Sequence, residues 1–413
     1  MNRPNSHDDT KPAETAQHPL IAQAERWGAH NYHPLDVVIA SGEGVWLTDT
    51  EGRRFLDMLS AYSAVNQGHR HPHIIQALID QAQRVTLTSR AFHNDRMGPF
   101  LEQLCALTGY ESALPMNTGA EAVETAIKAA RKWGYQVKGV PAGEAEIIVA
   151  TDNFHGRTTT IVGFSTEPQY REGFGPFTPG FKVVSFGDVQ SLEAAFNERT
   201  VAFLIEPIQG EAGINVPPAG YLQRARELCD SHNALLLSDE IQTGFGRTGR
   251  LFGMDWEGVR ADGVMVGKAL GGGVLPVSAF LADRRVMDVF TPGDHGSTFG
   301  GNPLACAVAS AALDVLVNEG LADRADTLGA WFKAELEAIP SPHVREVRGR
   351  GLLLGVEIKA ESGPARPFCK ALMARGILCK ETHQQVIRFA PPLVIDRETL
   401  QWALGHIREV LSA

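Results

Sequence analysis

Long apolar runs, a surplus of basic residues and closely spaced cysteines are all missing from this sequence. No run approaches the ~20 consecutive apolar residues of a membrane span. Lys and Arg number 38 against 48 Asp and Glu, and the formal net charge of −10 disfavours a nucleic-acid partner, which requires a basic surface. Neither a disulfide framework nor a zinc site is predicted, because the five cysteines are far apart and form no CxxC pair: Cys105, Cys229, Cys306, Cys369 and Cys379.

The N-terminal stretch 1–18 lacks the apolar core of a signal peptide. It also contains acidic residues, which a transit peptide avoids. Together with the cysteine pattern, this predicts a disordered tail on a cytoplasmic protein.

What remains is an ordinary globular composition, in which 44% of the 413 residues are hydrophobic and 21% are charged. A chain of this length is too long for one core, so we expect two domains or one large domain with an appendage. The middle of the chain alternates apolar strands with amphipathic helices, which predicts an α/β fold with a large, mostly parallel sheet. The clearest strands are 145–152, 201–208, 234–240 and 262–268, and the clearest helices are 119–135 and 220–233.

The two ends of the chain have a different pattern. Residues 21–58 contain the hairpin-like stretch GVWLTDTEGRRFLDM, and a long helix from about Asn302 is followed by mixed helices and strands. We expect both ends to form one smaller α+β domain. The expected organisation is a tail at 1–18, an N-terminal segment of the small domain at 19–71, a large domain at 72–320 and a C-terminal small domain at 321–413.

The stretch DGVMVGKALGGG (262–273) takes an apolar strand up to one lysine and then to a cluster of glycines. Lys268 therefore lies just past the carboxyl end of a strand, where ligands bind in open α/β sheets and glycine lets the backbone approach them. Asp239 ends another strand in SDEIQTG, so both side chains can meet at one edge of the sheet. An acid and a lysine there suit pyridoxal phosphate, which needs an amine for its aldehyde and a carboxylate for its ring nitrogen. A solvated lysine or a surface ion pair is the alternative.

Further motifs allow two interpretations each. In NTGAEAVETAIK, Thr118 and Glu121 have the spacing of a capping box, and the amides of Gly119 and Ala120 could also hold a phosphate. GFGRTG (244–249) fits the GxGxxG pattern of dinucleotide-binding loops, which makes a nicotinamide-dependent oxidoreductase the rival from another class, but no helix follows and no acid closes a βαβ unit. GHRHPH (68–73) has three histidines without a carboxylate at ligand spacing, so a helix starting at its proline is favoured over a metal site. Arg157 and Arg388 suit a structural ion pair or a substrate carboxylate.

Four of these motifs together resemble the class III aminotransferases, which belong to the fold-type I group of pyridoxal-phosphate enzymes. They are the NTG helix start, DEIQTGFGRTG, the strand-borne lysine followed by glycines, and STFGGNP, and the resemblance runs from about Asn31 to the last helix. Within the class the chain is most similar to ornithine aminotransferases, through NYHPLDVV, YSAVNQGHRHP, TLTSRAF, RKWGY, GFGPF, EPIQGEAG and RFAPPLVI.

The resemblance implies a homodimer with active sites at the subunit interface. Lys268 would bond to the cofactor and move a proton, Asp239 would bind the pyridine nitrogen, and Gln242 would lie near the phenolic oxygen. Phe154 would stack on the ring. The other residues expected at the cofactor are Thr118, Gly119, Ala120 and His155 and, from the second subunit, Ser297 and Thr298.

For the substrate, the resemblance implies that Tyr32 and Arg157 bind the α-carboxylate and α-amine of ornithine, with Tyr62 nearby. Glu211 would pair with Arg388 while ornithine is bound and release it for 2-oxoglutarate. The implied reaction is a ping-pong transfer of the δ-amino group of L-ornithine to 2-oxoglutarate, giving glutamate 5-semialdehyde and glutamate. Acetylornithine and 4-aminobutyrate are the alternative donors; His155 stands where ornithine aminotransferases often have tryptophan, and histidine is common there in acetylornithine aminotransferases.

Overall fold

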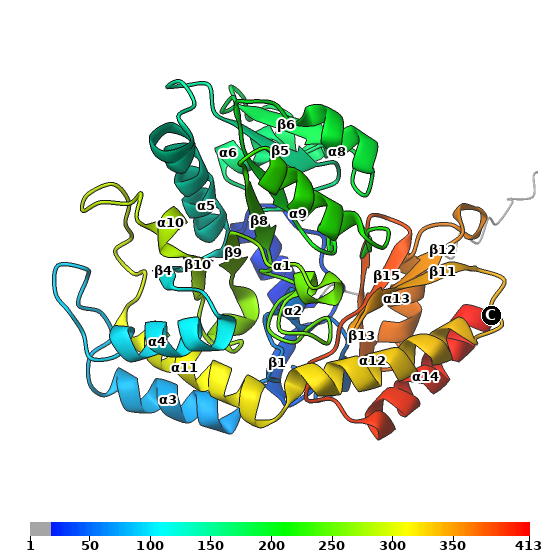
Figure 1. Ribbon diagram of the computed structural model, residues 1–413. Helices are drawn as coiled ribbons and strands as arrows, with labels where there is room; N and C mark the ends of the chain where they lie inside the picture. The colour runs from blue at the N-terminus through cyan, green and yellow to red at the C-terminus, as the bar shows by residue number, and fades with distance from the viewer. Residues whose placement is uncertain (1–17) are drawn as a thin grey trace, which may run out of the picture.

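The structure, a computed structural model, describes residues 18–413 of the chain. At its centre lies a seven-stranded sheet in which six strands run parallel and β10 runs antiparallel to both of its neighbours (Figure 1). The predicted mostly parallel sheet is therefore confirmed. In spatial order the strands are β4 (Ser112–Met116), β10 (Ser278–Ala282), β9 (Gly263–Val266), β8 (Leu235–Asp239), β7 (Thr200–Ile205), β5 (Glu146–Ala150) and β6 (Phe181–Val184).

Both faces of this sheet are covered, which explains why its central strands are continuously apolar. Along β8, Leu235 and Leu237 pack into the core that contains α5, whereas Leu236 points into the core on the opposite face. Strand side chains alternate in this way because successive Cβ atoms point to opposite faces. The main surrounding helices are α3 (Pro72–Ala82), α4 (Met97–Thr108), α5 (Gly119–Trp133), α8 (Val189–Ala195), α9 (Tyr221–Ser231) and α11 (Pro303–Asn318).

The two ends of the chain form two smaller sheets, one from both ends and one from the C-terminal part alone. Strand β13 from the C-terminal part pairs in parallel with β3 from the N-terminal part, as expected for a unit built from both termini. The predicted hairpin is present, and Gly52 in its turn has φ +82°, a conformation that favours glycine. One sheet is β1 (Ile39–Glu43), β2 (Trp46–Asp49), β3 (Arg54–Asp57) and β13 (Ile377–Leu378); the other is β11 (Val344–Arg350), β12 (Leu353–Ile358), β15 (Val386–Phe389) and β14 (Lys380–Thr382).

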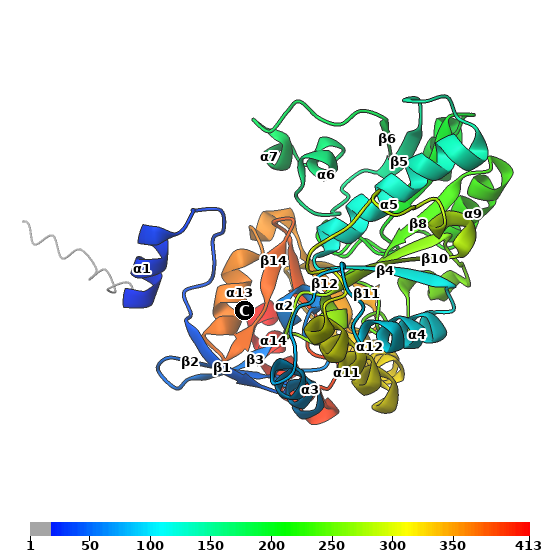
Figure 2. The ribbon, with the colours of Figure 1, turned by 90° about the vertical axis from the view of Figure 1, so that its left-hand side faces the viewer.

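The helices of the C-terminal part are α12 (Leu321–Glu337), α13 (Arg366–Met373) and α14 (Arg397–Ser412). Helix α1 (Pro19–Trp27) stands apart from the body (Figure 2). The expected tail lies outside the described residues except for His18, whose ring nitrogen accepts the N–H of Leu20 at 3.2 Å. No single helix of residues 18–413 is long and apolar enough to cross a membrane, and α11 and α12 pass that test only as a pair bent by 56°.

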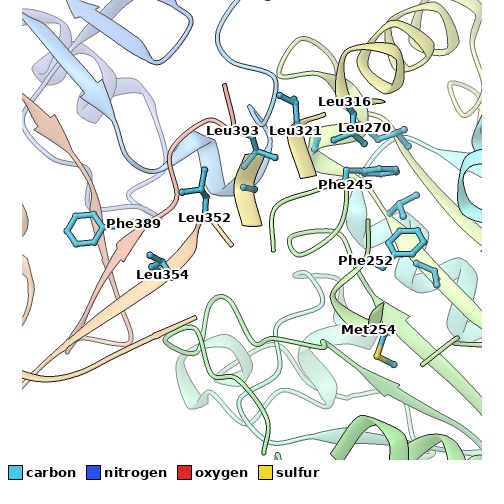
Figure 3. Close-up of a cluster of buried hydrophobic side chains, with 14 of the residues drawn as sticks. Phe245, Phe252, Met254, Leu270, Leu316, Leu321, Leu352, Leu354, Phe389 and Leu393 are labelled. Carbon is cyan, nitrogen blue, oxygen red and sulfur yellow. The ribbon is translucent and has the colours of Figure 1, made fainter. Parts of the chain in front are cut away.

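The segment GFGRTG forms a run of turns rather than a phosphate-binding loop before a helix. Its Arg247 is fully buried and donates to the carbonyls of Leu352 (2.9 Å) and Pro391 (2.7 Å) and to the side chain of Asn66. Apolar residues continue across the same region: Phe245, Leu270 and Leu316 lie near Leu352, Leu354 and Leu393 (Figure 3). The large and small parts of the chain therefore share one core here.

Pro72 of GHRHPH is the first residue of α3, as the sequence predicts. The three histidines face three different carboxylates: His69 lies 2.7 Å from Asp57, His71 lies 2.8 Å from Glu319, and His73 lies 3.5 Å from Asp314. Within the described part of the chain, no three His, Cys, Asp or Glu side chains are grouped as metal ligands.

Candidate active site

A cavity of about 200 Å³ lies at the carboxyl ends of the central strands. Glu206 follows β7, Asp239 ends β8 and Lys268 follows β9, so three chemically active side chains enter it from neighbouring strands. The N-terminus of α5 forms another wall. The lining residues are Gly119, Ala120, Phe154, His155, Gly156, Glu206, Ile208, Glu211, Asp239, Ile241, Gln242, Thr243 and Lys268.

The N-terminus of α5 has the predicted capping box. The hydroxyl of Thr118 accepts the N–H of Glu121 at 3.3 Å, and the Glu121 carboxylate accepts the N–H of Thr118 at 2.7 Å. Gly119 and Ala120 precede the first intrahelical bond, from Ala122 to the Thr118 carbonyl, so their amides are available to an anion in the cavity. A Cβ on Gly119 would lie 2.9 Å from the side chain of Ile241, which explains the glycine.

Asp239 is held by hydrogen bonds on both oxygens. One oxygen lies 2.7 Å from Nδ1 of His155, and the other accepts the N–H of Ile241 at 3.1 Å. Burial alone would lower the pKa of His155, but the hydrogen bond and charge of Asp239 outweigh it and raise that pKa. The aspartate is only 5% exposed, as expected for a carboxylate that must act in a low-dielectric site.

Lys268 is the first residue of a short 3-10 turn, η3 (Lys268–Gly271), and has φ +44°. Such a left-handed backbone is strained for a residue with a side chain and is found at functional sites. Burial lowers the pKa of the lysine amine, against the attraction of the Glu211 and Asp239 carboxylates. A lowered pKa increases the fraction of neutral amine, the form that attacks a carbonyl.

Glu211 and Arg388 form an ion pair beside Lys268. The Glu211 carboxylate lies 2.8 Å from the Arg388 guanidinium, and the same oxygen accepts from the Gln242 amide at 3.0 Å. Burial would raise the pKa of Glu211, but the charge of Arg388 lowers it to about 2, so the acid remains ionised. Arg388 is 2% exposed, and its guanidinium lies 5.3 Å from the ring centre of Tyr62.

Seven expected site residues are not part of the cavity lining in the single chain: Tyr32, Tyr62, Thr118, Arg157, Ser297, Thr298 and Arg388. Arg157 is exposed next to Phe154, with 5.5 Å between its guanidinium and the ring centre. Tyr32 is 74% exposed and lines a separate cavity with the rest of the N-terminal segment. Ser297 accepts from the Asn117 amide at 2.9 Å, and Thr298 is exposed; their roles stay predictions.

The sequence analysis missed two residues near this site. Glu206 is 8% exposed and accepts the N–H of Phe154 at 3.0 Å, and burial raises its pKa to about 8. Its position just after a buried strand, the same signal that pointed to Asp239, could have revealed it. Tyr170, which contacts Arg157, lies in a single helical turn, and its sequence carries no such signal.

The residues present fit pyridoxal phosphate. Two buried polar atoms on the cavity wall, Nε2 of His155 and Oε1 of Gln242, have no hydrogen-bond partner within the described chain. The cavity combines helix amides for a phosphate, an aromatic face at Phe154, a buried carboxylate at Asp239 and an amine at Lys268. These groups match the phosphate, the ring, the ring nitrogen and the aldehyde of that cofactor.

Comparison with known proteins agrees with this geometry. The family described as Aminotransferase class-III matches residues 27–411. An ornithine aminotransferase of Brevibacillus brevis is 60% identical over 392 residues, 95% of this chain and 98% of the relative. The ornithine aminotransferase structure of Toxoplasma gondii, with partial occupancy of pyridoxal phosphate at its active site, has a TM-score of 0.94 at 47% identity and covers 95% of this chain and 93% of that chain. An acetylornithine aminotransferase of Elizabethkingia anophelis has a TM-score of 0.86 at 46% identity, covering 95% and 98%.

Proposed function

Because the chain belongs to the class-III aminotransferase family, we propose that it is an ornithine δ-aminotransferase, which transfers the δ-amino group of L-ornithine to 2-oxoglutarate. The products are glutamate 5-semialdehyde and glutamate. The observation that carries this choice is the ion pair beside Lys268 between the buried Arg388 and the half-buried Glu211. An arginine that an acid can cover or release lets one cavity accept a second amine in one half-reaction and a dicarboxylate in the other.

The cofactor is pyridoxal 5′-phosphate, whose protonated ring withdraws electrons from the carbon that carries the transferred nitrogen. Gly119 and Ala120 would hold its phosphate through their amides, and Phe154 would lie beside the ring. Asp239, oriented by His155, would keep the ring nitrogen protonated. Lys268 would bind the aldehyde and move the proton, a role that its lowered pKa favours.

Ornithine enters with its δ-amine toward Lys268 and its α-carboxylate away from that residue. Arg157 binds that carboxylate, and Tyr32 and Tyr62 complete the site around the α-amine and the carbon chain. Glu211 neutralises Arg388 during this half-reaction. When Glu211 turns away, Arg388 binds a carboxylate of 2-oxoglutarate.

The active enzyme is a homodimer with its sites at the subunit interface. Ser297 and Thr298 lie outside the cavity of their own chain, which supports a contribution across the interface. Exposed apolar side chains supply surface that a second copy can cover, among them Trp27 (76% exposed) and Phe299 (56%). Each subunit has a large domain at 72–320 and a small domain built from 19–71 and 321–413, and the enzyme acts in the cytoplasm.

A second candidate, acetylornithine aminotransferase, is favoured by His155 and by the similarity to the Elizabethkingia structure. Profiling of amine donors with 2-oxoglutarate as acceptor separates the two candidates. We expect the highest kcat/KM with L-ornithine, and lower values with N-acetylornithine and 4-aminobutyrate. A preference for N-acetylornithine would overturn the proposed donor while leaving the cofactor chemistry in place.

A further inference from the structure

Arg157 is held by an aromatic ring rather than by an acid. Its guanidinium carbon lies 3.7 Å from the centre of the Tyr170 ring and 5.5 Å from that of Phe154. The two rings contact each other edge to face, with centroids 6.0 Å apart. Within residues 18–413 no carboxylate forms an ion pair with Arg157, although the side chain is exposed.

This arrangement leaves the donors of Arg157 available. A guanidinium stacked on an aromatic face has its plane fixed by that contact, while its N–H groups lie in the plane and point away from the ring. Two parallel N–H groups match the two oxygens of a carboxylate. The contact with the ring face uses none of these N–H groups, and the hydrogen bond between Arg157 and the Tyr170 side chain is the weakest of the influences on the Tyr170 pKa.

Tyr170 is itself well anchored. It lies in α7 (Pro168–Arg171), a single turn whose first donors are bonded: the Gln169 N–H to the Glu167 carboxylate and the Tyr170 N–H to the Glu167 carbonyl, at 3.3 and 3.1 Å. The next residue, Arg171, donates to the carbonyl of Ser165 at 3.1 Å. The ring thus has a fixed base from which to position Arg157.

We propose that Tyr170 is a positioning residue that holds Arg157 in the orientation that binds the substrate carboxylate, and that it thereby sets the preference for donors carrying a carboxylate. The inference rests on the proposed function, because it takes Arg157 as the group that binds the α-carboxylate. Tyr170 does not itself line the cavity, and it reaches the lining only through the edge-to-face contact of its ring with Phe154. Its loss weakens binding of the carboxylate and leaves the chemical step unchanged.

The test compares two donors in single half-reactions of the cofactor-loaded enzyme, followed by absorbance. L-Ornithine carries the carboxylate, and 1,4-diaminobutane has the same two amines without it. For Tyr170→Ala we expect an apparent Kd for ornithine about tenfold higher, because Arg157 loses the ring contact that fixes its orientation. The limiting rate constant with ornithine and all constants for diaminobutane are expected to stay within about twofold of wild type.

Two further variants and a binding measurement separate positioning from general damage. Tyr170→Phe keeps the ring face, so ornithine binding stays close to wild type. Phe174→Ala removes a ring from the same segment that is 60% exposed and makes no cation–π contact with Arg157. We expect the apparent Kd and the rate constants for both donors to stay unchanged in this variant. Calorimetric titration of the loaded enzyme with pentanoate, a carboxylate that cannot react, shows the same weakening in Tyr170→Ala alone.

Three outcomes would overturn the inference: unchanged ornithine binding in Tyr170→Ala, equal losses for both donors, or a loss in the limiting rate constant alone. Failure of the proposed function can be told apart from failure of this inference, because it would be measured in the wild-type enzyme and not in a variant. Wild type that reacts no better with ornithine than with diaminobutane would remove the role of Arg157 before any variant is compared.

Discussion

The carboxylate of Asp239 is the residue on which cofactor chemistry depends most directly. It is fixed by His155 and by the N–H of Ile241, and it points into the cavity from the end of β8. For Asp239→Asn we expect a folded protein that has lost roughly a hundredfold or more in kcat with ornithine, because an amide cannot hold the ring proton as a carboxylate does. Circular dichroism and steady-state kinetics check both parts. A variant within about threefold of wild type would assign the ring nitrogen to another group.

In the proposed cycle, Glu211 controls when Arg388 can bind a substrate carboxylate. Glu211→Ala leaves the buried guanidinium uncovered throughout the cycle, so we expect faster reaction with glutamate and slower reaction with ornithine, without loss of cofactor. Stopped-flow half-reactions with each donor measure the ratio. Glu357→Ala is the matched control, since Glu357 also pairs with arginines but lies outside the cavity lining, and it should leave the ratio unchanged.

Glu206 makes the stability of the protein depend on pH. Its pKa rises from 4.5 to about 8 on folding because burial disfavours the charged form. The folded state thus binds an extra proton between these values, and the resulting stability is complete below 4.5 and lost as pH rises through 8. We expect Glu206→Gln, which stays neutral, to lose less stability than wild type between pH 6 and 9. Urea unfolding at several pH values tests this, and parallel curves for the two proteins would contradict it.

At the scale of elements, the N-terminus of α5 has both a structural and a binding role. Thr118→Ala removes the capping box, and we expect it to cost roughly 1 kcal/mol of unfolding free energy. It should also weaken cofactor binding severalfold, because the first turn that presents Gly119 and Ala120 loses order. Asp396→Ala removes a comparable cap from α14, far along the chain, where the Asp396 carboxylate accepts the N–H of Thr399 at 2.7 Å.

The two caps should differ in one measurement only. Both variants lose similar stability in urea unfolding, whereas equilibrium dialysis with pyridoxal phosphate shows a loss for Thr118→Ala and none for Asp396→Ala. Equal cofactor affinity in both variants would limit Thr118 to a structural role.

At the scale of the whole molecule, Arg247 ties the large part of the chain to the small part through Leu352, Pro391 and Asn66. Burial lowers its pKa to about 9. Arg247→Met removes these bonds and leaves their acceptors unsatisfied, so we expect a loss of about 3 kcal/mol or more in unfolding free energy.

The control for this prediction is Arg250→Met, in the same segment. Arg250 is 42% exposed and pairs with Asp326 at 3.1 Å, an arrangement that contributes about 1 kcal/mol or less. Chemical unfolding monitored by tryptophan fluorescence compares the two variants. Similar losses in both would show that the bonds of Arg247 do not hold the two parts together.

Much of the fold could be predicted because its signals are local. The apolar run before Asp239, the Thr118–Glu121 spacing and the TEG turn each depend on residues a few positions apart, and β8, α5 and the hairpin all formed where expected. The family resemblance extended this to the cofactor and to the expected pairing of Glu211 with Arg388. The strand, the helix start and the turn follow from backbone geometry and side-chain periodicity, which the local sequence carries, whereas the cofactor and the pairing came from the resemblance alone.

Other features were decided only by the tertiary structure. The parallel pairing of β13 with β3, the burial of Arg247 between two parts of the chain and the stacking of Tyr170 on Arg157 have no counterpart in local patterns. Glu211 and Arg388 are 177 positions apart, and their 2.8 Å contact requires the register of β15 against β12 as well as the turn after β7. Strand register and core packing fix where each of these side chains lies, and a buried charge is stable there only if it is paired. No short stretch of sequence contains both partners of such a pair.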